Sequence, residues 1–309
     1  MSKYLLGIDN GSTVSKAALF DLKGKEIAIA GCAADTEYPH PGWTERDMEM
    51  LWQSTATAVR EVLAKTGVRS EEIAGIGCTG HGNGLYLLDK QGQPLRNGIQ
   101  SLDSRAADII VEWNERDLHA QAFPYTFQSF WPAQPNALLV WIKDNEPHNY
   151  ERIGAILMVK DYIKYRLTGE ISGDYTDMSA TSLMDVGSKR YSRELMALYG
   201  LPELYEALPP LKGSSEIAGQ VTRSAAEETG LAVGTPVVGG LFDVDASAIG
   251  SGVIDPNQAC LVMGSWSINE VITKEPIVDP NLFMTTIFAD PEYFLTIEGS
   301  ATSATNLEW

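Results

Sequence analysis

The first thirty residues alternate between apolar runs and short polar turns, a pattern typical of β-strands joined by tight connections. Apolar-rich runs predict strands at residues 3–9, 15–21 and 26–32, and Gly24 lies in the turn between the last two. Because a glycine in a short connection favours a hairpin, we expect antiparallel strands at the start of the chain rather than a strand–loop–helix unit.

A long amphipathic segment follows this hairpin. Between residues 46 and 65, apolar side chains recur at helical spacing: Met48, Leu51, Trp52, Ala56, Val59, Val62 and Leu63. Thr55 lies within this stripe and weakens it slightly, and Gly67 is placed to end the helix. The apolar run at residues 73–78 predicts a buried strand, so a helix and a further strand follow the opening hairpin.

The rest of the chain mixes both kinds of element. Helices are predicted at residues 104–115, 135–144, 156–167 and 225–229, with strands at residues 85–89 and 259–273. Residues 190–212 are predicted to be helical and then looped. Residues 174–186, DYTDMSATSLMDV, are rich in carboxylates and hydroxyls and are predicted to form a polar loop. The chain is therefore predicted to be α/β.

A faint internal repeat suggests two related domains. Residues 5–21 and residues 259–273 both consist of an apolar strand, a turn containing Gly-Ser, and a second strand. Glycine, Asp255 and Pro256 cluster near residues 250–256. We therefore predict one domain at residues 1–252 and the beginning of a second at residues 253–309.

The composition fits a globular protein of this organisation. The chain has 309 residues, of which 44% are hydrophobic and 9% aromatic, enough to form a core. At about 150 residues per domain, this length suggests two domains. The net charge of −18 predicts a surface that repels nucleic acid and anionic lipid. A small phosphate ligand remains possible, because it needs only a pocket of N–H groups and one cation.

Cysteine and histidine usage argues against a metal-rich or disulfide-bonded protein. Cys32, Cys78 and Cys260 are far apart and suit a reducing compartment, and four histidines form no dense metal cluster. The N-terminus lacks the features of a signal peptide, and no run of about 18 apolar residues predicts a membrane span. We expect a cytoplasmic protein that binds neither nucleic acid nor membrane, with a homodimer as the default oligomer.

The stretch GIDNGSTVSK suggests phosphate and metal chemistry. Gly11 lets a ligand approach the backbone, and a tight turn can point successive N–H groups at an anion. Ser12 and Thr13 add hydroxyl donors, Lys16 adds a cation, and Asp9 can hold Mg²⁺ at the strand end. The stretch is not a P-loop, because it lacks GxxxxGK[ST] and a hairpin follows it. A plain β-turn with solvated polar residues is an equal alternative on this stretch alone.

Seven stretches in the same order resemble the FGGY family of carbohydrate kinases. They are GIDNGSTVSKAALFD, PGWTERD, IGCTGHGNGLYLLD, SLDSRA, KDYIKYRLTGE, GTPVVGGLFDVDA and LVMGSWSI. PGWTERD, GNGLYLLDK and GTPVVGGLFDV are most similar to the kinases of L-xylulose within that family. The resemblance implies an actin-like ATPase (ribonuclease-H-like) fold whose two domains close over a cleft. It implies that the first domain binds sugar, that the second mostly binds ATP, and that Mg²⁺ is the metal.

The resemblance also assigns roles to the acidic residues. Asp243, in GGLFDVDA, matches the aspartate that takes the proton of the sugar hydroxyl, and Asp9 matches the metal-associated aspartate. Asp243 is therefore our candidate general base and, with Asp9, a candidate metal ligand. A helix N-cap is the structural alternative for Asp243, and both roles can coexist.

Two turns match the phosphate-binding positions of the family. The resemblance assigns them to Gly11, Ser12, Thr13 and Lys16 in the first domain, and to Gly264 and Ser265 in the second. Trp266 departs from the family pattern, where a smaller residue is commoner, and this makes contacts at Ser265 less certain.

For the acceptor sugar, the candidate residues are polar or aromatic and follow the family's sugar-contacting stretches: Asn83, His81, Trp43, Asp103, Arg105 and Asp245. Each has an alternative. His81 is expected to be exposed between glycines, and Trp43 could anchor the next helix instead. Asp103 and Arg105 could form an internal ion pair, and Asp245 could cap a helix. Gly82 falls where glycerol kinases carry arginine, so glycerol looks disfavoured.

The expected reaction is ATP-dependent phosphorylation of a ketopentose such as L-xylulose. Xylitol, erythritol, 3-keto-L-gulonate and other pentuloses remain alternatives, because stereochemistry depends on ångström-scale placement. A non-catalytic sugar sensor and an actin-like or chaperone-like ATPase are the competing functions. Because family members continue beyond residue 309, we expect a whole sugar domain plus the start of a truncated nucleotide domain, with little activity alone.

Overall fold

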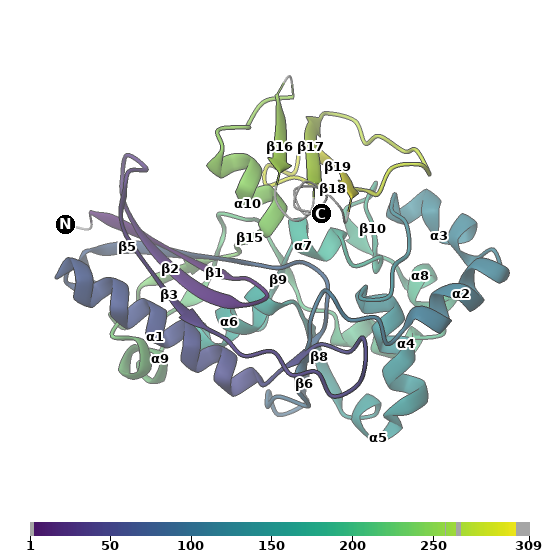
Figure 1. Cartoon of the computed structure of the whole chain (residues 1–309), viewed down its shortest axis with the longest axis horizontal. Coiled ribbons are helices and arrows are strands. Elements are labelled where there is room, and N and C mark those ends of the chain that lie inside the picture. Colours follow the sequence, from purple (N-terminus) through teal and green to yellow (C-terminus); the bar gives the residue numbers. More distant parts are fainter. Residues whose placement is uncertain (1–2, 257, 264–266, 301–309) are drawn as a thin grey trace.

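The computed structural model describes residues 3–256, 258–263 and 267–300. Figure 1 shows a twisted sheet lying over a long helix, a lobe of shorter helices, and a second, smaller sheet above them. The predicted phosphate-binding residues Gly264 and Ser265, with Trp266, lie outside the described residues.

The main sheet begins with the predicted hairpin. Within the described residues it has seven strands, in the order β13-β14-β5-β1-β2-β3 with β15 also paired to β5. Their bounds are β1 Tyr4–Asn10, β2 Val14–Asp21, β3 Glu26–Ala33, β5 Ile73–Gly80, β13 Ile217–Gln220, β14 Pro236–Val238 and β15 Leu241–Phe242. The first three strands, β1, β2 and β3, are antiparallel neighbours. Strands β1, β14 and β15 each pair with β5 in the parallel direction. The sheet is therefore mixed, as an α/β fold requires.

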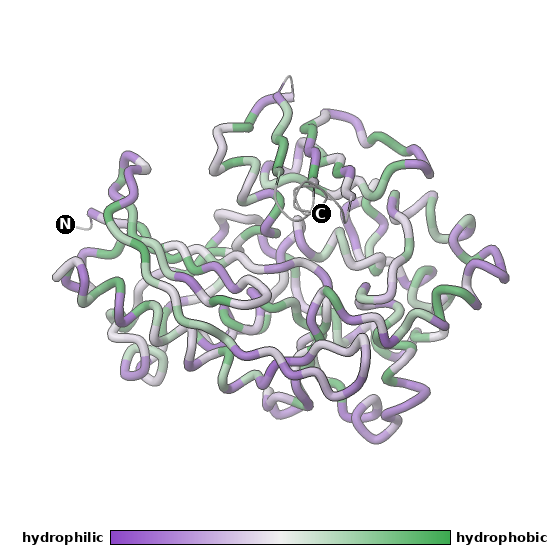
Figure 2. The backbone as a smooth tube through the Cα atoms, in the orientation of Figure 1, coloured by the Kyte–Doolittle hydropathy of each residue, from purple (hydrophilic) through white to green (hydrophobic). Residues whose placement is uncertain are grey.

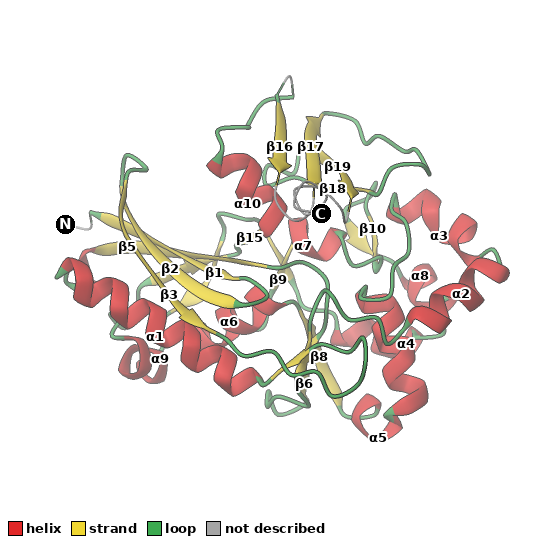
Figure 3. Ribbon diagram, in the orientation of Figure 1, coloured by secondary structure: helices red, strands yellow, loops and turns green. Residues whose placement is uncertain are grey.

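Helix α1, Met48–Thr66, covers one face of this sheet (Figure 3). The Asp47 side chain accepts a hydrogen bond from the amide of Met50 at its start, and Gly67 ends it in the left-handed conformation. Its predicted apolar stripe is buried against β2 and β3, together with Leu6 and Ile8 of β1, except that Leu63 is only half-buried. The short helix α9, Arg223–Thr229, packs beside it.

A helical lobe lies beside the sheet. Its helices are α2 Ala107–Glu115, α3 Leu118–Thr126, α4 Pro135–Asn145, α5 Pro147–Tyr150, α7 Tyr175–Ser179 and α8 Arg193–Leu198, with the 3₁₀ turn Pro202–Ala207. Helix α6, Val159–Thr168, packs instead against β5, β13 and β14 of the main sheet, and the 3₁₀ turn Ser70–Glu72 precedes β5. Its strand pairs are β4 Glu45–Arg46 with β7 Gly98–Ile99, β6 Tyr86–Asp89 with β8 Ile153–Leu157, β9 Gly173–Asp174 with β12 Leu211–Lys212, and β10 Met184–Asp185 with β11 Arg190–Tyr191. The ring of Trp113 stacks on that of Tyr199 in its core.

The second sheet contains the predicted second hairpin. It has the order β16-β17-β19-β18, with β16 Ala259–Met263, β17 Ser267–Thr273, β18 Met284–Ile287 and β19 Phe294–Ser300, all antiparallel. Helix α10, Asp243–Gly250, connects the main sheet to it. Figure 1 shows α10 and α7 between the two sheets. The structure does not test a division at residues 252 and 253, which stays a prediction.

Two predictions from the pattern are wrong. Residues 156–167 do not form one helix, because β8 occupies Ile153–Leu157 before α6 begins at Val159. Residues 174–186 are not simply a polar loop, because they contain α7 and β10, and Asp174, Asp177 and Ser179 are fully buried. Their polar groups are instead bound by other buried side chains, as described below.

The hydropathy of the turn between β2 and β3 matches its exposure. Figure 2 shows the tip of the turn between β2 and β3 as hydrophilic, and this turn projects away from the body. In the part of the chain that the structure describes, no helix is both long enough and apolar enough to cross a membrane.

Candidate active site

The carboxyl ends of three parallel strands meet at one place in the main sheet. Asp9 of β1 lies opposite Thr79 of β5, and Thr79 lies opposite Leu241 of β15. The Thr79 hydroxyl donates a hydrogen bond to the Leu241 carbonyl at 2.8 Å, which ties β15 to β5. In open α/β sheets, ligands bind beyond such strand ends. The strand register thus places Asp9 and the start of α10 about two strand spacings apart, roughly 10 Å between backbones.

Asp243 is the first residue of α10, directly after β15. The N-cap residue of this helix is Phe242, so the alternative that Asp243 is the N-cap is wrong. Asp243 as a whole residue is half-buried. The protein groups around its carboxyl nevertheless exclude enough water that burial raises the pKa of this carboxyl to about 7, and the negative charge of Asp9 adds to the effect. A carboxyl with a pKa near neutrality is suited to take a proton from an alcohol.

Asp9 faces the same opening. Its carboxylate forms an ion pair with Lys16 at 3.3 Å, and both side chains are more than a third exposed. Asp9, Lys16, Thr79 and Leu241 line a cleft of about 1140 Å³ that also touches α10 at Ala246. The structure therefore places Asp9 and Lys16 on a cleft that α10 also lines, and the assignment of this cleft as the active site stays a prediction.

The turn at residues 11–13 is held from behind by two side chains that the sequence analysis missed. Arg46 donates hydrogen bonds to the carbonyl of Gly11 at 3.1 Å and to that of Ser12. Gln100 donates to the Ser12 carbonyl at 3.1 Å. Because these donors occupy the carbonyls, the turn has a fixed shape. The only available sequence signal was the arginine in PGWTERD, which lies far from the turn along the chain.

A neutral hydrogen-bond network lies under the same turn. The Asn10 amide donates to Thr55 at 2.7 Å and to Ser15 at 3.0 Å, and Ser15 shares a further bond with Ser54 at 2.9 Å. All four side chains are buried. Thr55 is therefore more than an interruption of an apolar stripe, because its hydroxyl supports the end of β1.

The loop at residues 80–84 carries two candidate acceptor ligands. His81 is 5% exposed, so the expectation that it is exposed is wrong. Its Nε2 lies 3.0 Å from the Tyr86 hydroxyl, and burial lowers its pKa to about 4, which keeps the ring neutral. Asn83 is also buried, in a left-handed conformation with φ of 59°. Its Oδ1 has no hydrogen-bond partner among the described residues, so it is free to accept one from a ligand.

Asp103 and Arg105 form the internal ion pair that the sequence left open. The guanidinium group of Arg105 donates to both Asp103 oxygens at 2.9 Å, and neither side chain is exposed. It also lies 4.2 Å from the centroid of Trp43, which is therefore covered on one side. Trp43 contacts Trp141 edge-on as well, so it anchors this region. A sugar contact by these three residues is not tested and stays a prediction.

Asp245 lies in the first turn of α10 and is fully buried. Neither oxygen has a partner of normal hydrogen-bond geometry within the described part of the chain, although the amide of Ala289 approaches it. The alternative that Asp245 caps the helix is therefore wrong. Burial raises the pKa of Asp245 well above its usual value, and the charges of Asp174 and Glu270 add to this.

A buried charged network supports the strand end that carries Asp243. Lys160 forms ion pairs with Asp174 at 2.5 Å, Asp161 at 2.8 Å and Asp177 at 3.3 Å, all without exposure. Burial alone would lower the pKa of Lys160, but these carboxylates hold it well above the usual value. Burial raises the pKa of Asp177 to about 8 despite Lys160. The network thus keeps a lysine charged in the core.

This network reaches the backbone just before β15 and at the last residue of β15. Lys164 pairs with Asp161 at 3.0 Å and donates to the Gly239 carbonyl at 2.9 Å. Thr176 donates to Asp174 at 2.5 Å and accepts from the amide of Phe242 at 2.8 Å. The residue just before Asp243 is therefore fixed by a buried chain of hydrogen bonds. The stretches KDYIK and DYT carried this signal, but their partners are distant in sequence.

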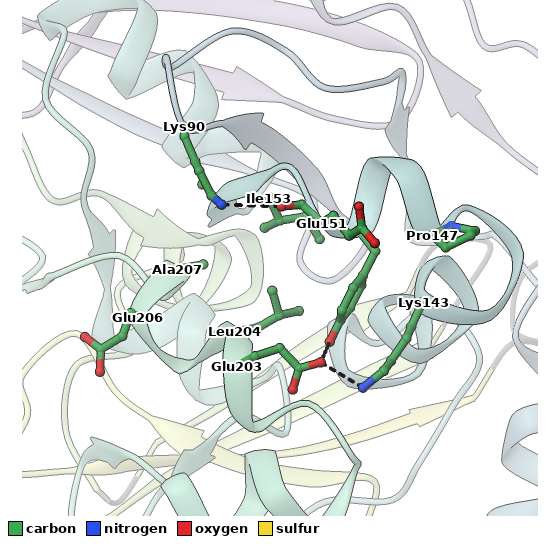
Figure 4. A pocket seen from close by; sticks show the side chains of 11 residues that line it. Lys90, Lys143, Pro147, Glu151, Ile153, Glu203, Leu204, Glu206 and Ala207 are labelled. Carbon is green, nitrogen blue, oxygen red and sulfur yellow. Dashed lines mark hydrogen bonds and ion pairs between the residues drawn. The ribbon is translucent and has the colours of Figure 1, made fainter.

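A second pocket, of about 680 Å³, lies far from these strand ends at the edge of the helical lobe (Figure 4). Several of its polar groups already bind one another. Lys143 and the Tyr150 hydroxyl both bind Glu203 at 2.8 Å, and Lys90 donates to the Glu151 carbonyl at 3.4 Å. We therefore assign no function to it.

The donor set of the cleft fits a magnesium ion only in part. Among the described residues, no group of three or more His, Cys, Asp or Glu side chains is arranged to hold a metal. Mg²⁺, however, needs only one or two carboxylates when phosphate and water complete its shell. Asp9 lines the cleft and Asp243 begins α10, which also lines it, so these are the two carboxylates that would hold the ion. Burial is the main cause of the raised pKa of Asp243, and a cation would offset the smaller contribution of the Asp9 charge.

The fold and these strand ends define an actin-like (ribonuclease-H-like) ATPase architecture. The N-terminal domain of the FGGY family of carbohydrate kinases matches residues 4–250, so the chain belongs to this family. A solved xylulose kinase from Rhodospirillum rubrum superposes with a TM-score of 0.93 and 29% identity, over 99% of this chain and 62% of that one.

Two curated relatives give a finer comparison. A probable L-xylulose kinase from Pasteurella multocida is 41% identical over 99% of this chain and 64% of its own length. An L-xylulose/3-keto-L-gulonate kinase from Escherichia coli is 38% identical over 100% of this chain and 62% of its own length. The chain therefore spans less than two thirds of the length of these relatives.

Proposed function

We propose that the whole protein is an ATP-dependent kinase of a sugar hydroxyl, with a ketopentose such as L-xylulose as acceptor. The observation that supports this proposal is the strand register, in which Asp9 of β1 and Leu241 of β15 flank Thr79 of β5 and Asp243 directly follows β15. The names of the relatives from Pasteurella multocida and Escherichia coli support L-xylulose as the first acceptor to test.

Asp243 acts as the general base in this proposal. Its carboxylate accepts the proton of the acceptor hydroxyl as that oxygen bonds to the γ-phosphorus of ATP and ADP leaves. The pKa of about 7 gives the carboxylate enough basicity while leaving it substantially ionised near neutral pH. The Thr176 and Lys164 hydrogen bonds to residues 242 and 239 hold the base in place.

The turn at residues 11–13 and Lys16 bind the terminal phosphates. Arg46 and Gln100 fix the carbonyls of the turn, and Lys16 supplies a positive charge beside Asp9. Bound Mg²⁺ would neutralise phosphate charge, and Asp9 and Asp243 are the residues that would hold it. Gly264 and Ser265 are proposed as the second phosphate turn on the basis of sequence alone.

The acceptor is bound on the other side of Asp243. Asn83 offers an unpartnered Oδ1 within the structure's described range, and neutral His81 lies in the same loop. Trp43, Asp103, Arg105 and Asp245 remain proposed contacts. We also propose that residues 1–252 form the sugar-binding domain and residues 253–309 begin the nucleotide-binding domain.

Acceptor binding and phosphorylation test this proposal separately. Isothermal titration of the chain with L-xylulose, xylitol, erythritol and 3-keto-L-gulonate should give saturable binding, tightest for a ketopentose. A coupled ADP-release assay on the whole protein should then show turnover that needs both acceptor and ATP. Binding without turnover would favour a sugar sensor, and ATP hydrolysis unaffected by every sugar would favour an actin-like ATPase.

A further inference from the structure

The glycines of the acceptor loop GHGNG are required for different reasons. At Gly84, φ is +75° and an added Cβ would lie 2.4 Å from the Ile99 carbonyl oxygen, so the backbone itself demands glycine. Gly82 does not have a positive φ. Its backbone would therefore accept an ordinary side chain.

At Gly82, the atoms nearest to an added Cβ all belong to one side chain. An added Cβ would lie 2.0 Å from Cε2 of Phe242 and 2.7 Å from its Cδ2 and Cζ, and these are the three nearest atoms. The ring of Phe242 thus occupies the space into which a side chain at position 82 would extend. Residues 82 and 242 therefore depend on each other sterically: while residue 242 is phenylalanine, residue 82 must be glycine.

The ring of Phe242 is held firmly in this position. Its amide donates to Thr176 at 2.8 Å, and its side chain, 6% exposed, packs in an apolar cluster with Val244, Ala180 and residues of the second sheet such as Met284. The ring cannot move away from Gly82 without disrupting this cluster. Phe242 also directly precedes Asp243, so a single residue contacts the acceptor loop at Gly82 and leads into the start of α10.

We propose that Phe242 is a specificity-determining residue whose ring, seated on Gly82, forms the apolar wall that limits the length of the acceptor. This inference rests on the proposed function, because it concerns the same acceptor site. In this proposal an acceptor that extends from Asp243 to Asn83 contacts the Phe242 ring, because the ring lies against the loop that carries Asn83 and precedes Asp243. The ring offers carbon rather than oxygen to the acceptor, and it disfavours acceptors longer than a ketopentose.

Four variants of the chain test this wall by calorimetric binding and thermal unfolding. Phe242→Ala should improve binding of a ketohexose relative to L-xylulose by about tenfold or more, since one added carbon in a fitted pocket changes affinity by about that factor. Phe242→Leu, which keeps more of the apolar cluster, should shift the same ratio less. Gly82→Ala should lower the Tm and weaken L-xylulose binding. Gly82→Ala combined with Phe242→Ala should unfold at a higher temperature than additivity predicts.

Gly75→Ala is the matched control, because its added Cβ would meet nothing closer than 3.8 Å, and Phe242→Ala should not change its effect. If the unsubstituted chain binds none of the sugars, the proposed function fails. If it binds L-xylulose but Phe242→Ala and Phe242→Leu weaken all acceptors by the same factor, the ring is only structural and this inference is overturned. Gly82→Ala that binds and melts like the unsubstituted chain would also overturn it.

Discussion

The turn at residues 11–13 and strand β15 are supported by different kinds of buried polar network. Beneath the turn at residues 11–13, Asn10, Ser15 and Thr55 use only neutral groups. Beneath β15, the network centred on Lys160 and Asp174 uses full charges. A neutral hydrogen bond contributes about 1 kcal/mol, whereas breaking a buried ion pair costs about 3–5 kcal/mol. The base is therefore more strongly fixed, and its support is more sensitive to a single change.

Lys160→Met should give the largest effect. The substitution leaves Asp161, Asp174 and Asp177 without their shared cation, and we expect the free energy of unfolding to fall by about 3–5 kcal/mol. Urea unfolding of the chain would measure it, with the exposed Lys90→Met as control. A loss below about 1 kcal/mol would show that the charged network does not dominate.

Thr176→Val should have an intermediate effect. It leaves the amide of Phe242 without a partner and removes one hydrogen bond to Asp174, which keeps Lys160 and the Thr176 amide. The unpartnered amide costs about 1–3 kcal/mol. Thr176→Ser keeps the hydroxyl and should unfold close to the unsubstituted chain in the same urea titration. Equal losses for both variants would mean that the methyl group, rather than the hydrogen bonds, matters at this position.

Thr55→Val should have a smaller effect, because Asn10 keeps its bond to Ser15. We expect about 1 kcal/mol of lost stability, measured by thermal unfolding, with Thr57→Val on the same helix as the comparison. A loss as large as that of Lys160→Met would remove the contrast between the two networks.

The pH dependence of stability sharpens the comparison further. The pKa of Asp243 is raised from 3.8 to about 7, so the folded state holds this proton more tightly than the unfolded state does. The stability that this proton contributes is present below about pH 4 and is lost as the pH rises towards 7. The Tm of Asp243→Asn minus that of the unsubstituted chain should therefore increase from pH 5 to pH 8. A constant difference would contradict the raised pKa.

Local pattern predicted the elements but not their environment. The opening hairpin and α1 were predictable, because alternation and helical spacing act over neighbouring residues. Residues 174–186 were misassigned because their polar side chains are paired with Lys160 and with other residues that are distant in sequence. An apolar run such as residues 153–157 is equally compatible with a strand or a helix. The predicted helix at 156–167 therefore began inside β8.

The candidate site was predictable in part for the same reason. Asp9 lies near the end of β1 and Asp243 directly follows β15, which a motif can indicate, and in the sheet these two strands lie on either side of β5. The burial of His81 and the hold of Arg46 on the phosphate turn depend on tertiary contacts. Sequence spacing contains no information about such contacts.

The most direct test of the account is Asp243→Asn in the whole protein, with ADP release and acceptor binding measured together. If Asp243 is the base, kcat should fall by about 10²–10⁴-fold while the Kd for L-xylulose changes by less than tenfold. A kcat within threefold of the unsubstituted protein would contradict the central claim.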